Sequence, residues 1–151
     1  MKGNIYIGYQ GIGKSSTAGN SYIDLESSYF PKEENWYKNY CGLAFSLAEQ
    51  GYNVFISSHE VVRKELADNK SLHPEVRITT IYPQLKLKSL WLNRLKSRYK
   101  ADSSSKNARA LLNAQEHYED NIKEMKADAL KYGFDIIEIK EIDYKLIDYL
   151  N

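Results

Sequence analysis

Eight consecutive residues near the N-terminus combine glycine, lysine and serine in a pattern suited to holding a phosphate. The segment Gly8 to Ser15 reads GYQGIGKS and matches the pattern G-x-x-x-x-G-K-[ST] in full. Glycines let backbone N–H groups turn inward around an anion, Lys14 can reach the β- and γ-phosphates of a nucleoside triphosphate, and a serine hydroxyl can bind Mg²⁺. The sequence therefore predicts a nucleotide-binding loop, with contacts from Gly8, Gly11, Ile12, Gly13, Lys14, Ser15 and Ser16.

Short β-branched and aromatic segments alternate with longer helical patterns along the chain, which is typical of an α/β fold. Several strand candidates are apolar almost throughout, as expected for strands covered on both faces of a parallel sheet. We therefore expect an α/β three-layer sandwich with a five-stranded parallel sheet. The expected strands are residues 4–7, 22–25, 53–56, 77–82 and 135–139.

Helical patterns separate these strands. In the first, Trp36, Tyr40, Leu43 and Leu47 recur at three- and four-residue steps and predict one buried stripe. The polar segment 101–106 is interpreted as a mobile loop between the last two helices. The expected helices are residues 36–50, 61–66, 87–99 and 107–132.

Two carboxylates lie at the end of the second expected strand. In a parallel sheet, ligands gather at the carboxyl ends of the strands, so residues just after each strand are candidates for chemistry. Asp24 and Glu26 alternate with Ile23 and Leu25, so both carboxylates can point to the same side. The alternative interpretation is a solvated strand end, where carboxylates are common.

Two arginines form a second candidate group. Arg94 and Arg98 are four residues apart on an expected helix and therefore lie on one face. Guanidinium groups stay charged and bind phosphate bidentately. The pair belongs to residues 76–101, a stretch with seven basic residues and no acidic one. The alternative interpretation is an ordinary solvated basic face.

The inner spacing Gly8-x-x-Gly11-x-Gly13-Lys14 resembles the phosphate loop of small P-loop kinases. These include nucleoside monophosphate, shikimate, gluconate and polynucleotide kinases. The chain is most similar in pattern to the compact adenylate-kinase-like ATP-binding proteins of bacteriophage and bacterial genomes. The resemblance spans residues 8–16, 23–30, 55–66 and 82–98, and only the first segment is highly specific. The D-G-[FY]-P-R acceptor segment of adenylate kinases is absent, as is a long helix after the phosphate loop.

The resemblance implies roles for several residues. Asp24, or Glu26 as second choice, would hold Mg²⁺ or accept the proton of the attacking oxygen, with Ser15 as the other metal ligand. Arg94 and Arg98 would begin a small helical lid of about residues 94–109 and stabilise transition-state charge. The expected catalytic residues are thus Lys14, Asp24, Arg94 and Arg98, and the expected substrate-binding residues are Glu26, Ser58 and Arg63.

Composition limits the alternatives. A chain of 151 residues fits one domain, residues 1–151, and the net charge of +1 argues against a general nucleic-acid coat protein. Apolar runs of about five residues are too short to cross a bilayer, so no membrane partner is expected. The start of the chain lacks a signal-peptide pattern and Cys41 has no partner for a disulfide, which together predict a cytoplasmic protein. The 13 tyrosines remain unexplained by composition.

We expect an ATP- and Mg²⁺-dependent phosphotransferase that transfers the γ-phosphoryl group to a (deoxy)nucleoside monophosphate. One alternative is a polynucleotide or modified-base kinase that binds nucleic acid along the basic block, the seven basic residues from Arg77 to Lys100. The net charge of +1 disfavours this alternative. Another is a non-catalytic nucleotide-sensing module, because a donor site alone does not establish a reaction. The acceptor and the oligomeric state are left open.

Overall fold

The central strand of the protein, β1 (Asn4–Gly8), pairs in parallel with β3 on one side and β4 on the other. In this computed structural model, which describes residues 1–150, the sheet has five strands in the order β2-β3-β1-β4-β5, all parallel. The remaining strands are β2 (Tyr22–Asp24), β3 (Asn53–Ile56), β4 (Arg77–Pro83) and β5 (Asp135–Ile139). The predicted α/β class and five-stranded parallel sheet are confirmed.

The inner strands form because their apolar residues are buried on both faces of the sheet. Ile5 of β1 lies opposite Val54 of β3 and Ile78 of β4, and all three side chains are buried. Burial on both faces removes the alternation of polar and apolar residues that an exposed sheet face would require. Such a sheet gives the loops at its carboxyl edge a rigid base.

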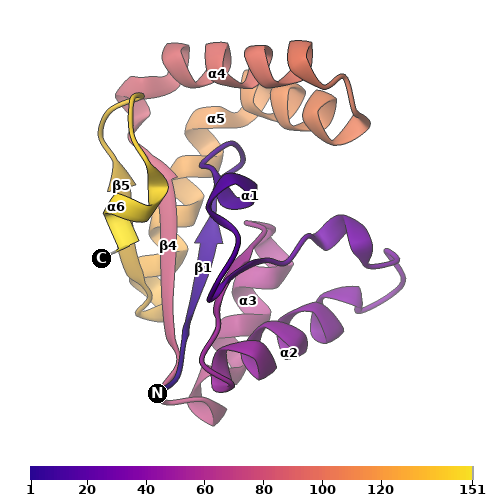
Figure 1. The fold of residues 1–151 in the computed structure, drawn as a ribbon, viewed down its shortest axis with the longest axis vertical. Helices are drawn as coiled ribbons and strands as arrows, with labels where there is room; N and C mark the ends of the chain where they lie inside the picture. The colour runs from indigo at the N-terminus through magenta and orange to yellow at the C-terminus, as the bar shows by residue number, and fades with distance from the viewer. Residues whose placement is uncertain (151) are drawn as a thin grey trace.

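Helices cover this sheet in an arrangement consistent with a three-layer sandwich (Figure 1). α2 packs on β1 and β3, α5 packs on β4 and β5, and the short helices α1 and α6 contact each other. α4 crosses one end of the molecule beside the loop that joins β1 to α1. The helices are α1 (Lys14–Thr17), α2 (Trp36–Glu49), α3 (Glu60–Asn69), α4 (Lys88–Ala101), α5 (Ser105–Tyr132) and α6 (Leu146–Leu150), with short 3₁₀ turns at Ser27–Tyr29, Lys70–Leu72 and Leu85–Leu87.

Two local expectations need correction. The predicted polar loop 101–106 is shorter, because the Ser104 side chain accepts a hydrogen bond from the N–H of Asn107 and starts α5 at Ser105. The predicted stripe on α2 is also partly wrong, because Leu43 is 41% exposed. The small residues Cys41 and Ala44 are buried instead, together with Tyr40, Phe45 and Ala48. Within residues 1–150, no helix combines the length and apolar character needed to cross a membrane.

Candidate functional site

The loop between β1 and α1 turns sharply at its glycines. Gly11 and Gly13 have φ angles of +85° and +107°, a backbone region that a side chain would strain. Lys14 folds back over the loop, and its Nζ donates a hydrogen bond to the carbonyl oxygen of Gly8 at 3.3 Å. Because α1 has a single turn, backbone amides of the loop, more than the helix dipole, are available to hold an anion.

A cleft of about 760 Å³ opens beside this loop. Its walls come from the loop, from the ends of β2 and β3, and from α3 and α5, as expected where parallel strands end together. Many of its lining residues are charged or polar, and they include Lys14, Asp24, Glu26, Ser58, Arg63 and Lys106. The structure thus brings both carboxylates that follow the second strand into one cleft with the loop lysine.

A smaller pocket of about 70 Å³ adjoins the loop. Ser15, Arg98 and both positive-φ glycines line it. Lys14, Asp24 and Lys106 line this pocket and the large cleft alike, which places these three residues where the two spaces meet. Two lysines and one aspartate therefore lie at this junction.

Lys14 and Asp24 shift each other's proton affinity within this junction. Burial lowers the pKa of Lys14 to about 8, although the Asp24 carboxylate opposes that change. Burial raises the pKa of Asp24, and the charge of Lys14 partly offsets the increase. Desolvation therefore outweighs mutual attraction for both groups. A bound phosphate would raise the pKa of Lys14 again and stabilise its ammonium form.

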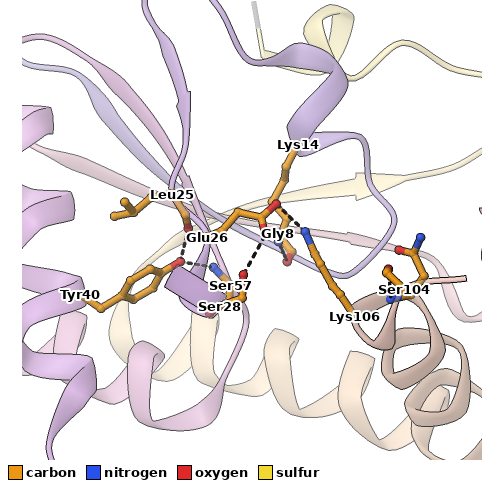
Figure 2. Close-up of polar contacts among 10 residues, drawn as sticks. Gly8, Lys14, Leu25, Glu26, Ser28, Tyr40, Ser57, Ser104 and Lys106 are labelled. Carbon is orange, nitrogen blue, oxygen red and sulfur yellow. Dashed lines mark hydrogen bonds and ion pairs between the residues drawn. The ribbon is translucent and has the colours of Figure 1, made fainter. Parts of the chain in front are cut away.

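Glu26 bridges the cleft to α5 (Figure 2). Its carboxylate forms an ion pair with Lys106 at 2.5 Å and accepts a hydrogen bond from the Ser28 hydroxyl at 3.1 Å. Burial raises the pKa of Glu26, but the hydrogen bonds and charge of Lys106 outweigh that effect and hold it below its usual range. Glu26 is therefore an ionised anchor for Lys106.

Tyr40 ties the ends of β2 and β3 together (Figure 2). Its hydroxyl donates to the carbonyl of Leu25 at 2.5 Å and accepts from the N–H of Ser57 at 3.0 Å. The Oγ of Ser57, which also lines the cleft, is buried and has no hydrogen-bond partner within residues 1–150. The sequence pattern predicts Tyr40 on a helix stripe, but nothing local shows that its hydroxyl reaches two strand ends.

Arg63 is held by protein groups. Only 4% of the residue is exposed, and its guanidinium donates to Glu124 at 2.7 Å, to Asp128 at 2.9 Å and to the carbonyl of Ser58 at 2.6 Å. Two carboxylates thus neutralise the arginine that was expected to contact an acceptor phosphate. Arg63 and Ser58 lie at the cleft wall, and Ser58 uses its backbone carbonyl to hold the guanidinium.

The two arginines of α4 have different surroundings. Arg98 lines the small pocket. Arg94 lines neither space, and its Nε donates a hydrogen bond to the carbonyl of Gly11 at 2.7 Å. On one face of α4, Arg98 therefore lines the pocket and Arg94 contacts the loop backbone.

Of the other predicted loop residues, some line the cleft or the pocket and others do not. Gly8 lines the large cleft, whereas Ile12 is fully buried in the core and supports the loop from below. The Ser16 hydroxyl donates to the carbonyl of Gly13 at 3.1 Å and lines neither space. The neighbouring Ser15 is the exposed hydroxyl at the pocket.

Several cleft residues were not predicted from the sequence. Lys106 was assigned to the polar loop, and its place on the first turn of α5 gives it the position opposite Glu26. Gln10, within the loop pattern, donates through Nε2 to Asn113 and to the carbonyl of Ala110, both at 3.0 Å, and so joins the loop to α5. Lys32 lines the large cleft as a further cation, and so does Arg109, which lies at the end of the lid region expected from the resemblance.

The donor groups at the small pocket match the ligand chemistry of magnesium. Ser15 offers a hydroxyl and Asp24 a carboxylate, and Mg²⁺ binds through one or two such oxygens together with water and substrate phosphates. Within residues 1–150, no group of three or more His, Cys, Asp or Glu side chains forms a metal cage. The available oxygens therefore fit a cation that arrives with a phosphate ligand.

The chain matches no protein-family model, and comparison with curated proteins and with solved structures gave no match. A function for the cleft therefore has to follow from the chemistry of the residues that line it.

Proposed function

We propose that the protein is a P-loop kinase that transfers the γ-phosphoryl group of ATP to a nucleoside monophosphate with the help of Mg²⁺. The observation that carries the proposal is the junction formed by Lys14, Asp24 and Lys106, which line both the small pocket at the loop and the large cleft. A phosphoryl transfer needs donor and acceptor to meet in line within a charged, preorganised site. This junction supplies such a meeting point.

The donor phosphates would lie against the loop. The positive-φ glycines Gly11 and Gly13 bring backbone close to the pocket, and Lys14 supplies a positive charge beside them. Arg98 lines the same pocket and can bind a phosphate oxygen through its fork of donors. These groups favour a polyphosphate over a neutral ligand.

The acceptor would occupy the large cleft. Its volume of about 760 Å³ lies within the range of small-molecule sites and exceeds what the loop phosphates need. Lys32, Lys106 and Arg109 line it and can balance an anionic group on the acceptor. A nucleoside monophosphate has both the size and the charge that this cleft accommodates.

Asp24 would accept the proton of the attacking acceptor oxygen. Its carboxylate lines the cleft beside Lys14, and its raised pKa makes it a better proton acceptor than an ordinary surface aspartate. Ser15 would hold Mg²⁺, with Asp24 as the second ligand in the alternative where it does not take the proton, and the bound metal would neutralise phosphate charge. Lys14, Arg98 and Lys106 would stabilise the charge that spreads over the transferring group.

A nucleotide-sensing module without turnover is the second candidate. One observation favours it: Arg63, the expected contact for an acceptor phosphate, is already neutralised by Glu124 and Asp128.

A polynucleotide kinase is supported less well. In the basic block, Arg77 pairs with Asp135 and Lys88 pairs with Glu119, which weakens a continuous track for nucleic acid.

The test is coupled-enzyme detection of ADP release, with ATP, Mg²⁺ and each ribo- and deoxynucleoside monophosphate in turn. The proposal expects release that depends on one or a few of these acceptors and stays low with water alone. A DNA and an RNA oligonucleotide with 5′-hydroxyls form the comparison arm. Release with the oligonucleotides only would favour the nucleic-acid kinase, and tight ATP binding without release would favour the sensor.

A further inference from the structure

Three consecutive carbonyl groups of the glycine loop accept hydrogen bonds from side chains far along the chain. Trp91 Nε1 donates to the carbonyl of Gln10 at 3.0 Å, and Arg94 Nε donates to that of Gly11 at 2.7 Å. The Tyr144 hydroxyl donates to the carbonyl of Ile12 at 2.6 Å. We call these three donors, Trp91, Arg94 and Tyr144, the carbonyl brace.

The brace is itself held by ring contacts. The Trp91 and Tyr144 rings stack with centroids 6.2 Å apart and an interplanar angle of 14°. The Arg94 guanidinium lies 5.2 Å from the centroid of each ring, and Trp91 is fully buried. Three side chains that fix one another in this way have little freedom to release a carbonyl.

Fixing the carbonyls also fixes the amides. In a trans peptide the C=O of one residue and the N–H of the next point in opposite directions. Carbonyls held outward at Gln10 and Ile12 therefore turn the N–H groups of Gly11 and Gly13 away from the brace. Within residues 1–150 neither of these N–H groups donates a hydrogen bond, and both glycines line the small pocket.

The amide between them serves the loop itself. The N–H of Ile12 donates to the carbonyl of Tyr9 at 3.3 Å, which closes the turn. The N–H groups of Gly11 and Gly13 thus lie on either side of the bonded N–H of Ile12. Successive N–H groups arranged in this way can form a concave site for an anion. Gly11 also leaves no room for a side chain, because a Cβ there would lie 2.9 Å from Leu95 and 3.3 Å from Trp91.

We propose that Trp91, Arg94 and Tyr144 are positioning residues that preorganise the loop to bind the phosphates of a nucleotide. Trp91 and Tyr144 hold the carbonyls of Gln10 and Ile12 outward and leave the N–H groups of Gly11 and Gly13 free for phosphate oxygens. Arg94 holds the carbonyl of Gly11 and so fixes the N–H of Ile12, which closes the turn. The proposal rests on the proposed nucleotide-binding function. It adds that α4 and the segment after β5 determine how tightly the loop binds phosphate. In this proposal Arg94 acts through the hydrogen bond from its Nε to the loop backbone, and this effect is separate from that of its positive charge.

Tyr144→Phe is the variant that removes one brace hydrogen bond and keeps the stacked ring. Tyr149→Phe is its matched control, because Tyr149 packs against the Tyr144 ring and, within residues 1–150, its hydroxyl contacts the N–H of Lys140 and no atom of the glycine loop. Arg94→Lys keeps the positive charge but loses the planar donor, so it separates backbone support from simple charge. Circular dichroism and thermal melting verify that each variant is folded.

Two measurements are made on the full chain. The first is amide hydrogen exchange of Ile12 without nucleotide, which reports opening of the loop. The second is calorimetric affinity for ATP with Mg²⁺ and for inorganic tripolyphosphate. We expect Tyr144→Phe and Arg94→Lys to exchange faster and to bind both ligands more weakly, by about three- to tenfold, the loss of one net hydrogen bond. Tyr149→Phe should match the wild type in both measurements.

The outcomes separate the two proposals. Unchanged Ile12 exchange and unchanged affinity in both brace variants, with the wild type binding ATP, would overturn the brace and leave the nucleotide site intact. A wild type that binds neither ATP nor tripolyphosphate would overturn the proposed function. Weaker ATP binding with unchanged tripolyphosphate binding would also contradict the brace, because the effect would then lie away from the phosphates.

Discussion

Lys106 Nζ lies 2.5 Å from the Glu26 carboxylate, so the first turn of α5 is joined to the loop after β2 across the cleft. The pair connects two segments that are 80 residues apart in the sequence. Because Lys106 also lines the small pocket, Glu26 holds a positive charge at the place where the two spaces meet. This contact gives the proposed kinase a cation that the sequence pattern alone did not indicate.

Lys106→Met should therefore reduce turnover more than stability. We expect kcat/KM for phosphoryl transfer to fall by about a hundredfold to a thousandfold, as for loss of one group that stabilises developing charge. The melting temperature should change little, because an ion pair with an exposed lysine contributes at most about 1 kcal/mol. Lys96→Met, at an exposed position of α4 that lines neither space, is the control. Equal effects of the two substitutions on kcat/KM would refute this role.

Asp24→Asn tests the carboxylate at the end of β2. Turnover should drop by about a hundredfold or more, the effect of losing a positioned proton acceptor, while ATP still binds. The substitution also removes the attraction that raises the pKa of Lys14, so that pKa should fall further. Steady-state kinetics and calorimetry separate the two effects. Asp68→Asn, which removes only an exposed partner of Lys64, should be neutral, and an active Asp24→Asn enzyme would exclude Asp24 from the chemistry.

The pH dependence of ATP affinity follows from Lys14. Burial lowers the pKa of this ammonium group to about 8 in the free protein, and bound phosphate charge should raise it. Binding then takes up a proton above pH 8, so affinity should stay level below that pH and fall above it, by at most about tenfold per pH unit. Calorimetry from pH 7 to 9.5 measures this. Lys14→Arg should remove the dependence, and a level wild-type affinity to pH 9.5 would contradict it.

Arg63 should matter for stability more than for substrate binding. Replacing it with Met leaves Glu124 and Asp128 without their buried partner and should lower the free energy of unfolding by about 3 kcal/mol. Arg77→Met is the matched control, because its ion pair with Asp135 is exposed and should contribute less than about 1 kcal/mol. Urea denaturation compares the two. Unchanged stability with a raised KM for the acceptor would restore the substrate-binding role expected from the sequence.

Local patterns predicted the fold well because each strand carries its own signal. The apolar segments on either side of polar turns located all five strands to within one or two residues, and the motif from Gly8 to Ser15 marked the loop between β1 and α1. The stripe on α2 was misread because Cys41 and Ala44 are small, and a helix can pack close to a sheet through small residues while Leu43 stays exposed.

The site was less predictable because its contacts join distant segments. Arg63 meets its two carboxylates only after α3 packs beside α5, 61 and 65 residues away. Tyr144 reaches the carbonyl of Ile12 across 132 residues, which no local period records. Of the 13 tyrosines, Tyr40 and Tyr144 thus use their hydroxyls to fix backbone at the candidate site.

The most direct test of the proposed kinase is the fate of the γ-phosphoryl group. ATP labelled at the γ-position is incubated with the protein, Mg²⁺ and each nucleoside monophosphate, and the products are separated by chromatography. The proposal predicts label on the β-phosphate of a nucleoside diphosphate, in equal amount to the ATP consumed, and none with Lys14→Met. Label that stays on ATP or appears only as inorganic phosphate, with every acceptor tried, would contradict it.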